Sequence, residues 1–294
     1  MERPEVHDVL RRWRVLADSY RPSRILLGET YVLDIRTMGR FYGIGDELHL
    51  AFNFTFIHAP FEASALAEVV AESELVIPDV GWPVWTASNH DVSRVMSRWA
   101  GGYDRKLRCA LLSLLTLRGT PVLYYGDEIG MPDTALSRAD LRDPPGIRYW
   151  PEPRGRDPER TPMHWTSEPG GGFTDPGVRP WLPLGDTTAR NVADQQRDPS
   201  STLNFVRDLI AIRRQRDGLR NGTYRQLPSP ADAWVWQRGP DTTIALNLSD
   251  RPVQIPALRG TVVIRTTRSH DGERLEGGLS LGPWEGAICS SAST

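Results

Sequence analysis

The sequence predicts an α/β domain built on parallel strands, followed by a small antiparallel β-domain. Up to Tyr125, helical patterns alternate with short apolar strand patterns, an order typical of parallel strands joined by crossover helices. After Gly218 the pattern changes to short β-type runs separated by turn residues. We therefore predict two domains, at residues 1–218 and 219–294.

The elements of the first domain follow from hydrophobic spacing. Apolar residues near the N-terminus, among them Val6, Leu10 and Trp13, keep helical spacing, and Pro4 suits a first helical turn. Four uncharged residues at 25–28 predict a strand that is buried on both faces. Further strands are expected at 46–54, 84–88 and 121–126, with helices at 61–75 and 103–119.

A long irregular segment, 126–199, follows and is rich in Pro, Gly, Arg and Trp. Loops of this length in a compact domain are usually functional or disordered, and the aromatic residues favour function. Aromatic rings suit sugar recognition because the apolar face of a pyranose stacks on them, although ordinary loop packing explains them equally well. A last helix is expected at 202–218, capped by Ser200 or Ser201.

The second domain shows five β-type runs, and no internal repeat occurs in the chain. The expected strands lie at 233–238, 242–248, 253–255, 261–266 and 285–289. In the first domain, four parallel strands are half of a (β/α)8 barrel, which needs about 250 residues. An open four-stranded sheet is the alternative, and the order of the elements favours neither.

Composition excludes several classes of protein. The net charge is −2 and Lys and Arg are spread along the chain, so we expect neither a nucleic-acid nor a membrane partner. No apolar run approaches a membrane span, and the charged N-terminus is unlike a secretory signal. Of the two cysteines, Cys109 lies in an apolar helical pattern and is expected to be a buried thiol. We expect a cytoplasmic protein.

Two carboxylates stand where an apolar strand meets a loop. Glu29 follows the first predicted strand, and Asp91 follows a later one with His90 beside it. Catalytic groups collect at the C-terminal ends of parallel strands, and a pair of carboxylates suits glycoside hydrolysis. The alternative is that both acids only cap the turns that follow. No Cys or His grouping has metal-ligand spacing and no Gly-rich phosphate loop follows a strand, so neither a metal nor a cofactor is expected.

Several segments, in order along residues 4–216, together resemble the α-amylase superfamily, glycoside hydrolase family 13. The likeness is greatest to its α-glucosidase and oligo-1,6-glucosidase branch. The segments are "LLGETYV", "DELHLAFNF", "SNHDVSR", "GTPVLYYGDEIGM", "GRDPERTPMHW", "PWLPL" and "STLNFVRDLIAIRR". "NHD" alone is a weak signal, whereas the ordered set is highly specific.

The resemblance implies the C-terminal half of a (β/α)8 TIM barrel, about strands 5–8, followed by the family's small β-domain. It implies retaining hydrolysis of α-glucosidic bonds in small oligosaccharides such as maltose or isomaltose. Glu29 would be the general acid/base and Asp91 the residue that stabilises the transition state. His90 and Arg156, together with Asp91, would bind the sugar.

The sequence departs from the family in one large respect. The family's nucleophile is an Asp in a motif resembling "GFRxDV", and no such motif occurs here. We therefore expect the isolated chain to be inactive, since a double displacement needs its nucleophile. We also expect it to require the missing N-terminal half, or to self-associate through exposed sheet edges.

Two alternatives remain open. The first is a transglycosylating relative of the trehalose or isomaltulose synthase type, which shares the same motifs. The second is a non-catalytic sugar-binding or interaction module on the same scaffold. The presence of Glu29, His90 and Asp91 together counts against the second.

Overall fold

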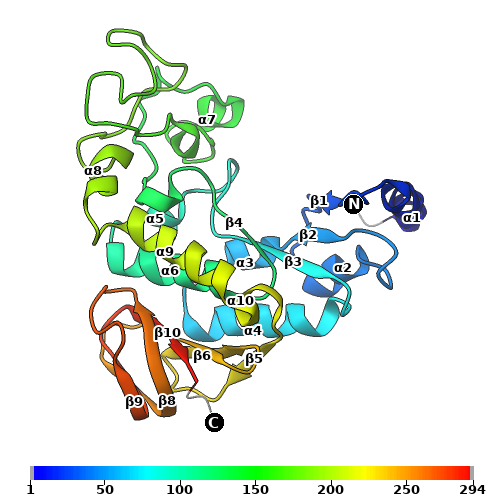
Figure 1. Cartoon of the computed structure of the whole chain (residues 1–294). Helices are drawn as coiled ribbons and strands as arrows, with labels where there is room; N and C mark the ends of the chain where they lie inside the picture. The colour runs from blue at the N-terminus through cyan, green and yellow to red at the C-terminus, as the bar shows by residue number, and fades with distance from the viewer. Residues whose placement is uncertain (1–2, 292–294) are drawn as a thin grey trace.

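The computed structural model describes residues 3–291 and contains two β-sheets (Figure 1). One is a parallel sheet of order β1-β2-β3-β4, and the other is antiparallel, of order β5-β6-β7-β10-β8-β9. The strands of the first are β1 (Leu27–Gly28), β2 (Leu50–Phe52), β3 (Trp82–Thr86) and β4 (Thr120–Val122). Those of the second are β5 (Tyr224–Leu227), β6 (Ala233–Arg238), β7 (Thr242–Asn247), β8 (Val253–Arg265), β9 (Arg274–Leu281) and β10 (Glu285–Ser290).

The order of the parallel sheet decides between the barrel and the open sheet. Each strand pairs with the next along the chain, with Leu50 opposite both Leu27 and Trp82, and Val84 opposite Thr120. A doubly wound sheet reverses its strand order at a switch point, and this one does not. Right-handed crossovers that all advance in one direction place every helix on the same face. The sheet is therefore built as a segment of a barrel wall, and the α/β prediction is confirmed.

Helices cover the outer face of this sheet and continue beyond it. They are α1 (Pro4–Ser19), α2 (Ile35–Arg40), α3 (Phe54–His58), α4 (Ala63–Val76), α5 (Val95–Arg98), α6 (Asp104–Thr116), α7 (Pro144–Tyr149), α8 (Val192–Arg197), α9 (Thr202–Gln215) and α10 (Asp217–Asn221). The four long helices are the predicted ones, and Ser201 caps α9 by accepting from the Asn204 N–H. The short ones escaped prediction because one or two turns show no readable period. Within residues 3–291, none of these helices has the length and apolar character that a membrane crossing requires.

The prediction that residues 25–28 form a strand buried on both faces is wrong. Only Leu27 and Gly28 form β1, which pairs with β2 alone at the edge of the sheet. Ile25 is 67% exposed and Leu27 is 49% exposed. Apolar residues in an uninterrupted run predict burial, but an edge strand has a neighbour on one side only.

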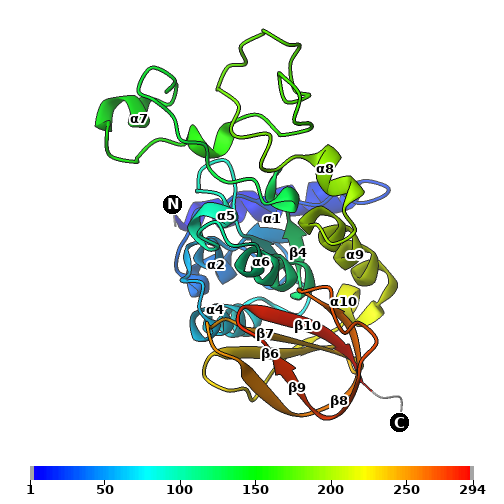
Figure 2. The same ribbon diagram turned by 90° about the vertical axis from the view of Figure 1, so that its left-hand side faces the viewer.

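One hydrophobic core joins the two sheets. Trp85 of β3 and Leu111 of α6 pack in the same cluster as Trp234 and Trp236 of β6, all of them buried. Val235, between the two tryptophans, belongs to a second core that lies inside the antiparallel sheet. Alternation along β6 thus assigns one face of the strand to each core. Figure 2 shows the antiparallel sheet lying against α4, α6 and α10.

The antiparallel sheet differs in detail from the expected strands. The runs predicted at 253–255 and 261–266 are parts of a single strand, β8, whose register shifts between Pro256 and Arg259. Ala257 lies inside this bulge with φ of 60°. Strands β5 and β9 were not predicted, because polar residues or glycines interrupt their apolar residues. Both cysteines are free and buried, as the position of Cys109 had predicted for that residue.

The segment 126–199 projects above the parallel sheet (Figure 1). It holds α7, α8 and two 3-10 turns at Asp127–Ile129 and Pro158–Arg160. Backbone hydrogen bonds fold it on itself, for example from the Val192 N–H to the His164 carbonyl at 3.0 Å. This segment supplies the arginines of the site described next.

Candidate active site

A pocket of about 170 Å³ opens where the four parallel strands end. Glu29 directly follows β1, and His90 lies four residues after the end of β3. Residues from all four strands or the loops after them line the pocket, so it lies where loops at the C-terminal end of a barrel place functional groups. The lining residues are Glu29, Phe52, Phe54, Thr86, Ser88, Asn89, His90, Val122, Leu123 and Tyr124.

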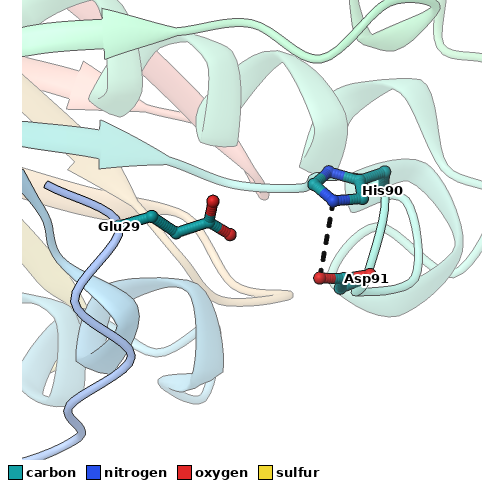
Figure 3. Close-up of side chains that lie close together, drawn as sticks. All are labelled: Glu29, His90 and Asp91. Carbon is teal, nitrogen blue, oxygen red and sulfur yellow. Dashed lines mark ion pairs between the residues drawn. The ribbon is translucent and has the colours of Figure 1, made fainter. Parts of the chain in front are cut away.

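Glu29 and His90 line this pocket, and Asp91 lies beside them (Figure 3). One polar atom from each lies within 4.8 Å of the other two, and all three residues are exposed. His90 Nε2 is 3.5 Å from Asp91 Oδ2. The carboxylate of Glu29 has no hydrogen bond or ion pair to any described residue. The structure thus brings together three of the four residues that the sequence singled out.

Local hydrogen bonds hold the turn that carries His90 and Asp91. The Asp91 N–H donates to Asn89 Oδ1 at 2.8 Å, an Asx turn that fixes the direction of the chain. Ser88, the residue before Asn89, is held as well, because its carbonyl accepts from Thr86 Oγ1 at 2.6 Å. The turn is therefore defined by its own sequence, and its side chains point at the pocket rather than along the strand.

The fourth predicted residue, Arg156, also reaches the site. Its Nη1 donates to Asp91 Oδ1 at 2.9 Å. The rest of the guanidinium is held by Asp143, which accepts from Arg156 Nη2 at 3.0 Å and Nε at 3.2 Å. These hydrogen bonds lower the pKa of Asp143 and, with those to Asp91, raise the pKa of Arg156. Asp143 is itself fixed, because its N–H donates to Asp157 Oδ2 at 2.8 Å.

Arg160 is a member of the site that the sequence reasoning missed. Its Nη2 donates to Asp91 Oδ1 at 2.8 Å, and its Nε donates to the His90 carbonyl at 2.7 Å. The available signal was its place four residues after Arg156 in "RDPER", across a short turn. Asp143 was missed too, because nothing in the sequence pairs it with Arg156.

Two guanidinium groups therefore share one oxygen of Asp91. Each is a charge-assisted hydrogen bond, and together they fix the carboxylate and stabilise its negative charge. A carboxylate oxygen held in this way is a poor nucleophile, because attack would have to displace both bonds. Oδ2, which faces His90, has no hydrogen bond among the described residues and can accept one from a ligand. The geometry suits a fixed negative charge beside a reacting centre.

The same three donors could also ligate a cation. A carboxylate from each acid and an imidazole nitrogen make a reasonable ligand set for a divalent metal. Arg156 and Arg160, which both contact Asp91, add positive charge beside it and oppose this use.

A second pocket, of about 380 Å³, adjoins the site through Arg160. Three of its aromatic residues are about half exposed or more, namely Trp165 (47%), Phe173 (51%) and Trp181 (67%). None of these rings contacts another aromatic ring or a cation among the described residues. Three aromatic residues of the long segment thus gather around one hollow that reaches Arg160, whereas Trp150 lines a separate pocket.

Two known sequence families match this chain. The sequence profile of the family "Alpha amylase, catalytic domain" matches residues 1–222. The chain belongs to the α-amylase family. A second profile, described only as a domain of unknown function (DUF3459), matches residues 220–288, which include most of the antiparallel sheet.

Curated members of the α-amylase family provide the sequence relatives. A probable α-glucosidase of Rhizobium meliloti is 38% identical over 228 residues, which are 75% of this chain and 40% of that protein. A probable oligo-1,6-glucosidase of Bacillus subtilis is 32% identical over 202 residues, 61% of this chain and 36% of that protein. The chain thus spans well under half the length of these two relatives.

Solved structures give the same fold. An α-glucosyl transfer enzyme superposes with a TM-score of 0.87 at 32% identity, covering 99% of this chain and 55% of that one. The trehalulose synthase of Pseudomonas mesoacidophila superposes with a TM-score of 0.86 at 23% identity, covering 98% and 59%. The predicted partial barrel with its C-terminal β-domain is therefore the architecture of known α-amylase family enzymes.

Proposed function

We propose that this chain carries part of the active site of a retaining α-glucosidase that acts on small α-glucoside oligosaccharides. The observation that carries the proposal is the meeting of Glu29 with His90 and Asp91 at one pocket, within 4.8 Å. The probable α-glucosidase of Rhizobium meliloti supports the substrate class. Retaining hydrolysis passes through an oxocarbenium-like transition state between two carboxyl groups.

In this proposal Glu29 is the general acid/base. Its side chain reaches the pocket without a protein partner among the described residues, which leaves the carboxyl group available to protonate a leaving oxygen. Asp91 stabilises the transition state through its fixed charge. Its Oδ2 accepts a hydrogen bond from a sugar hydroxyl, and the His90 imidazole forms a hydrogen bond with the same sugar. Arg156 orients Asp91 and contributes to the sugar site.

The nucleophile is a third carboxylate, supplied by polypeptide that completes the barrel. The family resemblance gives Asp91 a different role, that of transition-state stabiliser, and the two arginines on its Oδ1 fix its charge for that role. The partner we propose is a half barrel with four parallel strands, which would pair with the free edges of β1 and β4. The isolated chain then binds sugar weakly and does not hydrolyse it.

The test is complementation. The chain is assayed on an aryl α-glucoside alone, and again after co-expression with the N-terminal half of a related α-glucosidase that contains a "GFRxDV" segment. We expect no turnover alone and measurable turnover in the complex. Glu29→Gln should abolish the restored activity, and Glu168→Gln, an exposed carboxylate in the long segment, should leave it intact. Full turnover by the chain alone would refute the proposed need for a partner.

Transglycosylation is the second candidate. The likeness to an α-glucosyl transfer enzyme, at 32% identity, favours considering it. Product analysis of the complemented enzyme on maltose and sucrose separates the two activities. Glucose release supports hydrolysis, whereas a dominant disaccharide isomer supports transfer.

A further inference from the structure

A buried carboxylate lies behind the turn that carries His90 and Asp91. Asp127 follows β4 at the start of a 3-10 turn and is fully buried. Ser88 Oγ lies 2.7 Å from Asp127 Oδ1 and 2.6 Å from Oδ2. Ser88 is fully buried as well, and it precedes the Asn89–Asp91 turn directly. A single side-chain contact thus joins the end of β4 to the base of the active-site turn.

The contact between Ser88 and Asp127 offers fewer hydrogen-bond donors than the ionised carboxylate can accept. A serine hydroxyl has one hydrogen, so it can donate to only one of the two carboxylate oxygens at a time. The other oxygen has no side-chain donor among the described residues. If Asp127 is protonated, the carboxyl group can donate to Ser88 Oγ while its other oxygen accepts, and both groups are satisfied. The two protonation states therefore impose different hydrogen-bond directions at Ser88 Oγ.

Charged groups surround Asp127 but do not pair with it. Arg94 and Arg98 bring positive charge, and the neighbouring Glu128 brings negative charge. Arg94 is fully buried, with its guanidinium 4.9 Å from the Tyr124 ring centroid and 4.6 Å from that of Tyr125. Its Nε and Nη2 have no hydrogen-bond partner among the described residues. Asp127 likewise has no ion pair within the part of the chain that is described.

We propose that Asp127 is a positioning residue, which sets the place of His90 and Asp91 through Ser88 and moves their turn when it gains or loses its proton. Arg160 holds the far side of the same turn at the His90 carbonyl and at Asp91. The turn is therefore held between a partly buried guanidinium and a buried carboxyl group. Its relation to catalysis rests on the proposed glycosidase function, whereas the coupling itself does not.

Asp127 changes its protonation state at near-neutral pH. Burial raises the pKa of Asp127 to about 7, and the hydrogen bond from Ser88 and the charge of Arg94 oppose this rise. Asp127 therefore gains and loses its proton at pH values where enzymes of this family can be assayed. A positioning effect of this carboxyl group should be visible as a pH-dependent movement of residues 89–91.

The experiment follows backbone amide signals of residues 89–91 by NMR between pH 5 and 9. The chain is labelled with nitrogen-15 and studied in complex with the complementing half barrel, or alone if it is soluble. The experiment uses a His90→Gln background, so that no amide shift can come from the imidazole. We expect these amides to titrate near pH 7 and to lose that titration in Asp127→Asn, while Glu128→Gln, which removes the adjacent carboxylate, keeps it.

Identical titration in the presence and absence of Asp127, or no titration at all, would overturn the proposal. Ser88→Ala gives a second variant that removes the contact and leaves the carboxyl group in place. In Ser88→Ala the amide signals of residues 89–91 should no longer follow the protonation of Asp127, whereas the carboxyl carbon signal of Asp127 itself should still titrate. In a complemented enzyme with His90 intact, Asp127→Asn should also change the pH profile of kcat. If complementation fails, only the measurement of the pH profile of kcat is lost. The NMR titration still tests the coupling, so the two failures are distinguishable.

Discussion

Arg160 contacts the Asp91 region at two points, with Nη2 2.8 Å from Asp91 Oδ1 and Nε 2.7 Å from the His90 carbonyl. One guanidinium thus fixes both the charge that would face the sugar and the backbone that carries it. Its planar fork matches the two acceptors, which a lysine ammonium could not do. The orientation of the proposed catalytic acid–histidine pair therefore depends on a residue to which the family resemblance had assigned no role.

Replacing this arginine should impair catalysis in the complemented enzyme. Arg160→Gln removes a charge-assisted hydrogen bond of about 1.5–3 kcal/mol, so kcat/KM should fall roughly 10- to 100-fold. Steady-state kinetics on an aryl α-glucoside measure the effect. Arg154→Gln is the matched control, because Arg154 lies in the same loop and contacts the exposed Glu152 and the Tyr149 ring rather than His90 or Asp91. Equal activity of the two variants would contradict the assigned role.

The sequence could predict part of this site and no more. Glu29 and Asp91 were identified because each follows an apolar strand, and catalytic groups collect at the C-terminal ends of parallel strands. Arg156 was placed only by the family resemblance. Arg160, Asp143 and Asp127 act through contacts between residues 13 to 70 positions apart, for example Arg160 with His90. No periodicity in an irregular segment encodes such contacts, and so they required the structure.

A second buried arginine, Arg238, connects the antiparallel sheet to two helices. Arg238 of β6 is fully buried and donates to three backbone carbonyls, those of Thr116, Leu219 and Gly222. These carbonyls end α6 and α10, where the intrahelical bonds run out. Arg238→Met would leave them buried and unsatisfied, so we expect a loss of about 3 kcal/mol or more in the free energy of unfolding.

Urea denaturation measures this loss. Arg251→Met is the control, because Arg251 is in the same sheet region, 81% exposed, and pairs with Asp232 at the surface. Its removal should cost well under about 1 kcal/mol. A similar midpoint for both variants would show that the carbonyls of α6 and α10 find other partners.

The pH dependence of stability should report Glu159. This residue is 4% exposed, and burial raises its pKa to about 8 from an ordinary value of 4.5. Since the folded pKa is raised, the protonated carboxyl group contributes stability that is complete below about pH 4.5 and is lost as the pH rises through 8. Glu159→Gln should flatten this decline, which chemical denaturation at a series of pH values measures. An unchanged slope would contradict the assignment.

Much of the fold was predictable, and the failures share a cause. The long helices and three of the parallel strands show clear hydrophobic spacing over their whole length. The edge position of β1 was missed because an apolar run such as Ile25–Gly28 looks the same in the middle and at the edge of a sheet. The choice of a barrel segment over an open sheet depended on strand order, which spacing along one chain does not contain.

The free edge of β1 leads to a prediction about solution behaviour. Ile25 and Leu33, on either side of the strand, are 67% and 51% exposed, and β1 pairs with β2 alone. An uncovered apolar edge invites pairing with another chain, so we expect the isolated protein to self-associate and the complementing half barrel to suppress this. Ile25→Lys should reduce association, because a charge at an edge opposes strand pairing. Ile44→Lys, at a residue 89% exposed in a turn away from the strand, should not. Analytical ultracentrifugation over a range of concentrations measures both, and a monodisperse wild-type monomer would disprove the edge as an association site.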